Sequence, residues 1–134
     1  MGMSKGAEKI LKLLRSMGYL VIPEYEFVDL KGKNGRPLRF DFAVINPRHN
    51  TVSALVEYDG EMHFQQVKFF QHTQSDFKRA QGRDRKKNKY ALLHGIPLYR
   101  IPYWEIDNIK SVGDIFQPKF FVTNKYHNDL LKAP

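Results

Sequence analysis

The chain has 134 residues and a net charge of +8 with neutral histidines, because 22 Lys and Arg residues outnumber 14 Asp and Glu residues. This length favours one domain, and 42% hydrophobic residues are enough for a core, which excludes disordered and fibrous classes. Cysteine is absent, which excludes disulfides and thiolate metal sites and favours a reducing cytoplasm. Apolar stretches such as Tyr19–Ile22 have four residues, whereas a membrane helix needs about twenty, so we expect no membrane span.

The N-terminal third of the chain predicts a helix followed by the first strand of a hairpin. Apolar residues recur at helical spacing over roughly Lys5–Met17, with Ser4 as a cap and Gly18 as a C-terminal stop. A short strand is predicted at Tyr25–Val28. The turn-rich segment 31–37 follows, and its Asn-Gly pair favours a hairpin connection.

The middle of the chain predicts two further strands, a long helix and a last strand. Alternating apolar residues predict a strand that begins at Leu38 and another over about Val52–Asp59. A polar loop then extends to about Gln74, before a helix over roughly Asp76–His94 and a strand over Ile96–Tyr103. This αβββαβ order predicts an α/β fold with a mixed sheet.

We expect a single domain over residues 1–134, with its core in about residues 4–110, because no internal repeat or linker divides the chain. The pattern weakens after Trp104. A short helix is predicted around Ile106–Val112, and the tail, residues 113–134, is left without an assigned element.

The positive charge is concentrated in one segment, Lys78–Lys89, which holds seven basic residues and one acid and so six of the eight net charges. Such a concentration is typical of proteins that bind a polyanion, because neutralised phosphates release their counterions. The alternative is a solvated helix face without a partner.

Three acidic residues fall on predicted strands, where a structural role is hard to assign. Asp41 lies between two phenylalanines on a strand, and a buried carboxylate needs a partner or a metal. Glu57 and Asp59 share one face of the next strand, so pairing of the two strands brings the acids close together. We expect Mg²⁺ there, because it binds one or two carboxylates and takes phosphate oxygens as further ligands.

A fourth acid, Asp84, is predicted to point inward from the basic helix. At 100° per residue it shares its helix face with mostly small or apolar residues, namely Phe77, Ala80, Asn88 and Ala91. A merely solvated helix does not have this pattern. The alternative is an internal ion pair of Asp84 with Arg39 or Lys87.

His63 follows Asp59 by four residues, where the strand is expected to leave the sheet. An imidazole there can position or deprotonate a water molecule held by a metal ion. A lone histidine is also often structural, and that alternative stays open. The other four histidines have no comparable setting, and no ligand spacing predicts a zinc site.

Four motifs in this order resemble the very-short-patch-repair branch of the PD-(D/E)xK nuclease superfamily, and within it the phage homing endonucleases with an EDxHD active-site pattern. The motifs are FDF at Phe40–Phe42, EYDGEMHF at Glu57–Phe64, RDRKKNKY at Arg83–Tyr90 and LYRIPY at Leu98–Tyr103. The EYDG-x-x-HF block is the specific part. The resemblance covers roughly Ser4–Lys110 and implies a restriction-endonuclease-like αβββαβ core.

The resemblance also implies catalytic roles for particular residues. It matches Asp41 to the first metal-binding acid, Glu57 and Asp59 to the acids of the second motif, His63 to the active-site histidine and Asp84 to the acid of the following helix. The usual lysine of the second motif is absent, since Asp59 occupies its position. This assigns water activation to His63.

The predicted function is therefore a Mg²⁺- or Mn²⁺-dependent endonuclease that hydrolyses double-stranded DNA in the cytoplasm of a bacterial or phage-infected cell. Lys87 or a neighbouring base would offset developing charge. Phosphate contacts are expected from Arg83, Arg85, Lys86, Lys87 and Lys89. The alternatives are a nucleic-acid-binding module of the same fold without catalysis and RNA as the substrate. Cleavage of both strands would most simply use a two-fold homodimer.

One position departs from the family pattern. Relatives usually begin with a helix in which a glutamate three residues before an apolar position points into the site, as in SKGEEKI. Here the segment reads SKGAEKI, and Ala7 occupies the place of that glutamate, whereas Glu8 falls on the solvent side. We predict that the chain is impaired at Ala7, by evolution or by substitution; a harmless natural variant is the alternative.

Overall fold

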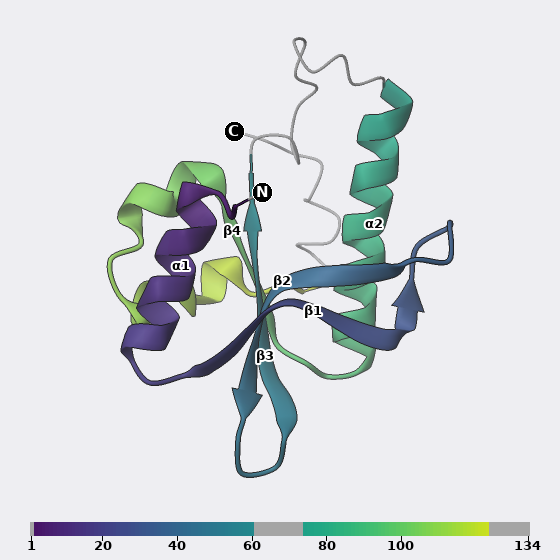
Figure 1. Cartoon of the computed structure of the whole chain (residues 1–134). Coiled ribbons are helices and arrows are strands. Elements are labelled where there is room, and N and C mark those ends of the chain that lie inside the picture. Colours follow the sequence, from purple (N-terminus) through teal and green to yellow (C-terminus); the bar gives the residue numbers. More distant parts are fainter. Residues whose placement is uncertain (1, 61–73, 124–134) are drawn as a thin grey trace.

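The computed structural model describes residues 2–60 and 74–123, which form helices on both faces of a four-stranded sheet (Figure 1). The elements in chain order are α1 (Lys5–Ser16), β1 (Leu20–Lys31), β2 (Pro37–Asn46), β3 (Thr51–Asp59), α2 (Gln74–Leu93), β4 (Leu98–Pro102), the 3-10 helix η3 (Tyr103–Asn108), α3 (Val112–Ile115) and the 3-10 helix η4 (Pro118–Phe120). The predicted αβββαβ order of the first six elements and the mixed α/β class are confirmed.

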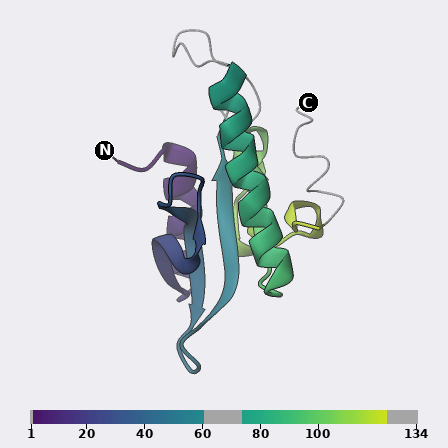
Figure 2. The ribbon, with the colours of Figure 1, turned by 90° about the vertical axis from the view of Figure 1, so that its right-hand side faces the viewer.

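The sheet has the order β1-β2-β3-β4, with antiparallel pairs β1/β2 and β2/β3 and a parallel pair β3/β4. A parallel pair needs a crossover, and α2 lies within that connection. Figure 2 shows the sheet nearly edge-on, with α1 on one side and α2 on the other. No helix in the described part of the chain is long and apolar enough to cross a membrane.

Two apolar clusters fill the space between the sheet and the helices. On the α1 side, Ile10 and Leu14 pack with Phe42 and Val56 of the sheet and with residues of the C-terminal helices. On the α2 side, Ala91 packs with Ala43, Leu55 and Leu98. Successive strand residues face opposite sides, so each buried strand contributes to both clusters.

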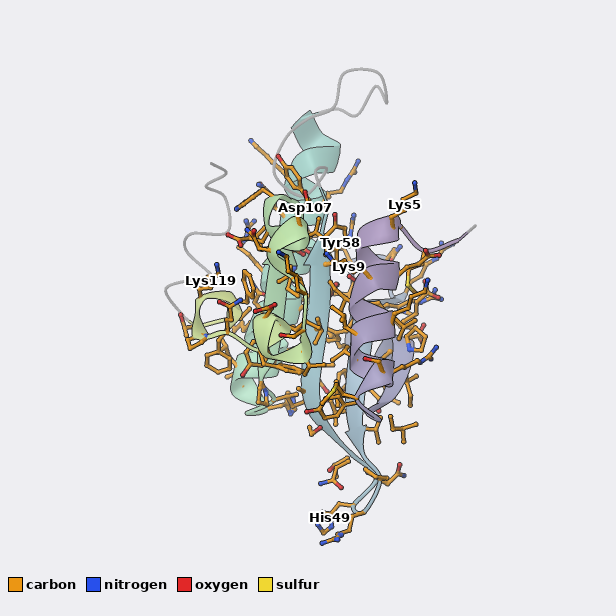
Figure 3. The ribbon with its side chains drawn as sticks, turned by 90° about the vertical axis from the view of Figure 1, so that its left-hand side faces the viewer. Lys5, Lys9, His49, Tyr58, Asp107 and Lys119 are labelled. Atoms are coloured by element: carbon orange, nitrogen blue, oxygen red, sulfur yellow. The ribbon has the colours of Figure 1, made fainter. Side chains whose placement is uncertain are left out.

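The first helix forms as predicted. Ser4 Oγ accepts a hydrogen bond from the Ala7 N–H at 3.3 Å, which caps the N-terminus, and Gly18 follows the C-terminus with a φ of +83°. Gly6 lies against the ring of Tyr58 on β3, where a Cβ atom would collide with the ring. Figure 3 shows Tyr58 beside Lys9 on this face of the sheet.

Two elements differ most from the prediction. β1 begins at Leu20 instead of Tyr25, because residues 20–23 pair with β2, and Pro23 is tolerated since β1 is an edge strand. The short helix expected around residues 106–112 is replaced by η3 and α3. A new helix begins after Ser111 because Asp114 Oδ2 accepts the N–H groups of Lys110 and Ser111.

Candidate functional site

A row of charged side chains crosses the centre of the sheet beneath α2. Glu57 on β3 pairs in register with Arg100 on β4. The pairing of Phe42 with Val56 places Asp41 on β2 beside Glu57 on the other side. The row thus consists of an acid, an acid and a base on three neighbouring strands.

Asp41 and Glu57 form a carboxyl pair. Asp41 Oδ2 accepts the backbone N–H of Tyr58 at 2.8 Å. Burial, the charge of Glu57 and a side-chain hydrogen bond with Glu57 together raise the pKa of Asp41 from 3.8 to about 8. Asp41 is therefore mostly protonated at neutral pH.

Lys87 reaches this carboxyl pair from α2. Its Nζ forms an ion pair with Glu57 Oε1 and lies 5.3 Å from the ring centroid of Phe40. Burial acts to raise the pKa of Glu57, but the charges of Lys87 and Arg100 outweigh it and hold that pKa below its usual value. Glu57 is therefore the ionised partner of the carboxyl pair.

Arg100 connects the end of β3 to α2. Its guanidinium is fully buried and lies 2.7 Å from Asp59 Oδ1, while its Nε donates to Asn88 Oδ1 at 2.6 Å. A further ion pair joins it to Asp84 Oδ1 at 3.6 Å. One side chain thus holds together three polar groups from a strand and a helix.

The structure brings four predicted site residues into one buried cluster. Glu57, Asp59 and Asp84 are buried between the sheet and α2, Asp41 beside them is half-buried, and the predicted inward direction of Asp84 is confirmed. The fifth, His63, lies outside the described residues.

The structure also tests the alternative that Asp84 forms an internal ion pair. Asp84 does pair inside the protein, with Arg100. Arg39, named as one candidate partner, instead lies at the surface and pairs with Glu26 at 2.8 Å.

Arg100 and Asn88 contribute to the cluster in ways that sequence reasoning missed. The sequence motifs give Arg100 no role of its own and place Asn88 only on the inward face of the helix. The available signal was an arginine in the middle of the strand LYRIP, flanked by residues that become buried. An interior strand position demands a counter-charge for arginine, and Asp59 and Asp84, which the sequence assigns to catalysis, supply it.

The carboxyl pair has the donor chemistry of a magnesium site. Mg²⁺ needs only one or two protein carboxylates, keeps several waters and binds substrate phosphates. Among the described residues no group of three or more Asp, Glu, His or Cys side chains is arranged to hold a metal ion. Asp41 and Glu57 therefore fit a two-carboxylate site, while Asp59 is engaged by Arg100.

Ala7 lies on the other face of the sheet. It is buried with Ile10 and Leu14 in the α1 cluster, and Glu8 is exposed, so the predicted faces of α1 are both confirmed.

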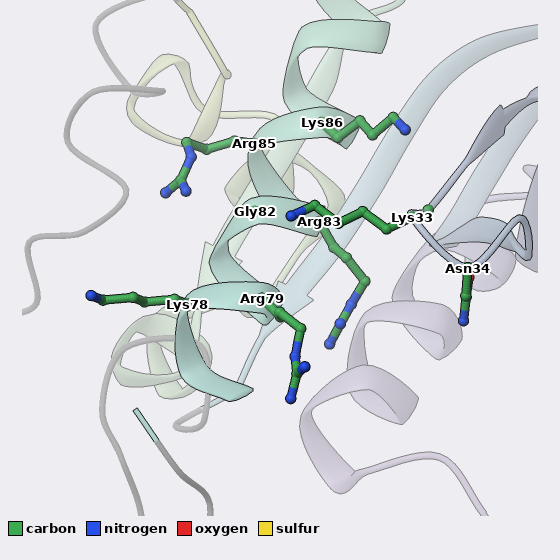
Figure 4. A pocket seen from close by; sticks show the side chains of 9 residues that line it. Lys33, Asn34, Lys78, Arg79, Gly82, Arg83, Arg85 and Lys86 are labelled. Carbon is green, nitrogen blue, oxygen red and sulfur yellow. The ribbon is translucent and has the colours of Figure 1, made fainter. Parts of the chain in front are cut away.

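The outward bases of α2 form one wall of a groove, and the loop between β1 and β2 forms the other. The cavity has a volume of about 880 Å³ and is lined by Gly32, Lys33, Asn34, Lys78, Arg79, Gly82, Arg83, Arg85 and Lys86 (Figure 4). Lys89 is also exposed, whereas Lys87 belongs to the buried cluster. The predicted phosphate-binding residues thus divide into four at or near the surface and one inside.

Comparisons with protein-family models, curated proteins and solved structures find no match for this chain.

Proposed function

We propose that this protein is a divalent-metal-dependent DNA endonuclease with a restriction-endonuclease-like core, related to the very-short-patch-repair branch of the PD-(D/E)xK superfamily. The observation that carries the proposal is the pair formed by half-buried Asp41 and buried Glu57, with Lys87 against it. A carboxyl pair on neighbouring strands is costly to bury, and a structural core has no need of it. Strongly perturbed carboxyl pKa values are typical of functional sites.

Asp41 and Glu57 are the residues that would hold Mg²⁺ or Mn²⁺. The ion would supply Lewis-acid stabilisation of a phosphate and an acidic bound water. The Tyr58 N–H orients Asp41, and Lys87 holds Glu57 in its ionised form. Asp59, the third predicted ligand, has a clear role in holding Arg100.

One remaining role follows the sequence prediction, whereas Asp84, which the resemblance matches to a catalytic acid, is given a structural role. His63 stays the proposed water-activating group, and Asp84 helps to fix α2 against the sheet through Arg100. Lys87 is close enough to Glu57 to offset negative charge that develops on a phosphate beside the carboxyl pair. The outward bases of α2 would bind the DNA backbone, and a homodimer would present two such sites to two strands.

A second candidate function is a nucleic-acid-binding module of the same fold without catalysis. One observation favours it, namely that the buried acids already have cationic neighbours: Lys87 for Glu57, and Arg100 for Asp59 and Asp84. Such a cluster can be stable without a metal ion.

Nicking of plasmid DNA by the purified chain at several Mg²⁺ and Mn²⁺ concentrations separates these functions. We expect the wild type to cleave DNA only when the metal is present. Asp41→Asn and Glu57→Gln should reduce cleavage to background, because each variant removes a carboxylate ligand. Both variants keep the size of the side chain, and Lys87 keeps an oxygen partner at position 57. Glu26→Gln, which changes a surface carboxylate, is the matched control.

Thermal unfolding gives a second measurement on the same proteins. Mg²⁺ should raise the midpoint of the wild type and of Glu26→Gln but leave Asp41→Asn unchanged, because a ligand stabilises only the state that binds it. Full activity of Asp41→Asn or Glu57→Gln would contradict the metal site. Absence of metal-dependent cleavage by the wild type and by Ala7→Glu would favour the binding module. Competition between duplex DNA and duplex RNA identifies the substrate.

A further inference from the structure

The groove between the β1–β2 loop and α2 is separate from the carboxyl pair. Six of its nine lining residues are Lys or Arg, and these nine described residues include no acid and no aromatic side chain. None of the buried acids or their cationic partners lines it. Whatever binds in the groove therefore does not contact Asp41 or Glu57 there.

The loop and the helix are fixed to each other at the groove. Lys86 Nζ on α2 donates a hydrogen bond to the carbonyl oxygen of Lys31 at the end of β1. Figure 4 shows Lys33 extending from the loop toward α2, with Asn34 on the same wall. The two walls are thus parts of one site, although they are far apart in the sequence.

Gly82 lies in the interior of α2, where glycine is unfavourable by about 1 kcal/mol relative to alanine. Its φ is not in the left-handed region, and a Cβ atom there would meet nothing within 4 Å beyond the helix backbone. Neither backbone conformation nor packing therefore requires glycine. Gly82 lines the groove, and the absent side chain allows a ligand to approach the helix backbone closely.

The charges along this side of α2 also indicate an anionic ligand. Arg79 and Arg83 are four residues apart, and Arg83 and Lys86 are three apart, so like charges are neighbours on the helix surface. Each such pair destabilises a helix by about 0.2–0.5 kcal/mol. Lys33 adds a further positive charge from the opposite wall. A bound polyanion removes this repulsion.

We propose that this groove binds the sugar-phosphate backbone of duplex DNA at a point away from the bond that is cut. The choice of DNA rests on the proposed function, whereas the requirement for a polyanion rests on the groove alone. A single strand is disfavoured because sites for single strands add aromatic side chains for base stacking, and the lining has none. Lys33 and Lys78, which sequence reasoning did not assign, become backbone contacts together with the helix bases.

The test measures binding of a labelled DNA duplex in EDTA between about 50 and 200 mM salt, where no metal-dependent cleavage interferes. The groove variant is Lys33→Gln with Lys78→Gln. The matched control is Lys12→Gln with Arg48→Gln, which removes the same charge from exposed positions on α1 and in the β2–β3 turn. A third variant, Gly82→Gln, fills the groove without changing the net charge, and urea unfolding verifies that each protein is folded.

We expect the groove variant to bind at least about tenfold more weakly near 0.1 M salt and to lower the slope of log K against log salt by about 1.8, or 0.9 for each lost contact. The control variant should change the slope by less than half as much. Gly82→Gln should weaken binding at unchanged charge, whereas Gly82→Ala should be the more stable protein.

Equal binding by the groove and control variants, or wild-type binding by Gly82→Gln, would overturn the proposal. Tighter binding of single-stranded DNA or of duplex RNA, with the same sensitivity to the groove variant, would overturn the choice of duplex DNA. Failure of the proposed nuclease function can be distinguished from failure of the groove proposal. If the groove variant loses binding but the wild type shows no metal-dependent cleavage, the groove proposal stands and the nuclease function is rejected.

Discussion

The charges of Glu57 and Lys87 balance each other only because Asp41 retains its proton and stays neutral. Glu57 is ionised next to the Lys87 ammonium, and Asp41 is neutral because its pKa is raised to about 8 by burial and by Glu57. A second negative charge at this depth would lack an equally close cation and would be costly. Two carboxyl groups with different protonation states at one pH are also the arrangement that acid–base chemistry uses.

The retained proton makes a prediction for the metal-free protein. The folded-state pKa of Asp41 lies above its usual 3.8, so its contribution to stability is complete below about pH 4 and is lost as the pH rises through 8. Within this window the native state holds a proton that the unfolded chain has released. The free energy of unfolding should therefore fall with pH by up to about 1.4 kcal/mol per pH unit from this group.

Urea unfolding in EDTA between about pH 5 and 7.5 measures this slope. Asp41→Asn has no proton to lose and keeps the acceptor for the Tyr58 N–H, so its unfolding free energy should depend less on pH than that of the wild type. The pKa of Glu57 is lowered, so its own contribution changes at lower pH, outside the window. Identical slopes for the two proteins would show that Asp41 is ionised in the native state.

At this scale the sequence predicted which acids are buried but not how they are paired. Alternation along the strands placed Asp41, Glu57 and Asp59 toward one another, and helical spacing directed Asp84 inward. Pairing depends on the alignment of β4 beside β3, which sets Arg100 next to Glu57. That alignment is a tertiary property, set by the crossover and by packing, and local periodicity contains no information about it.

At the scale of elements, helices with clear end signals were predicted best. Ser4 and Gly18 delimited α1 to within one residue, and Gly95, which follows α2 with a φ of +65°, marked its end similarly well. The start of β1 was missed because residues 20–23 read LVIP, an apolar run without alternation that ends in a proline, and proline within a run argues against a strand. η3 was missed because 3-10 turns have no strong hydrophobic period.

The N-terminus of α1 allows a test of the departure at Ala7. The resemblance predicts that Ala7→Glu raises the rate of DNA cleavage by at least about tenfold, which is about 1.4 kcal/mol of barrier, because it restores the acid that relatives carry. The position of Ala7 in the α1 core, on the face opposite the carboxyl pair, instead predicts an unchanged rate. The residue sits in the first turn of α1, and its N–H donates to Ser4 Oγ at 3.3 Å. Single-turnover cleavage at saturating metal measures the rate.

The structure supplies a competing explanation that the same variant tests. A glutamate at position 7 would complete the capping box Ser-x-x-Glu with Ser4, which stabilises the helix end without any catalytic effect. A rise in the unfolding midpoint with an unchanged rate would therefore support capping and reject the catalytic assignment. Glu8→Ala is the control; Glu8 is exposed, and a severe loss of activity in that variant would show that the wrong residue of α1 was assigned.

At the scale of the whole molecule, the two faces of the sheet have different compositions. The face beneath α1 is apolar, whereas the face beneath α2 combines an apolar cluster with the charged cluster at the carboxyl end of β3. α2 carries both proposed functions, because its inward side holds Asp84, Lys87 and Asn88 and other positions line the basic groove. The position of α2 on the sheet therefore determines the geometry of the site.

Arg100 links α2 to the sheet through buried polar contacts, which leads to a prediction for global stability. Arg100→Met keeps the apolar stem but removes the guanidinium that contacts Asp59, Asp84 and Asn88. Breaking a buried ion pair by removing one partner costs about 3–5 kcal/mol, because a buried charge loses its compensation. We expect a loss of that size in the free energy of unfolding, measured by urea denaturation at constant m-value.

Arg39→Met is the matched control for Arg100→Met, since Arg39 also pairs with a carboxylate at 2.8 Å but more than half of its side chain is exposed. Such surface pairs contribute about 0–1 kcal/mol, so this variant should unfold at nearly the wild-type urea concentration. Adding Asp59→Asn to Arg100→Met should recover part of the lost stability, because it removes one of the acids left without the guanidinium. If Arg100→Met and Arg39→Met lowered the free energy of unfolding by the same small amount, the apolar contacts of α2 alone would hold it on the sheet. The buried charges would then have no structural role, and a catalytic role would be the remaining explanation for them.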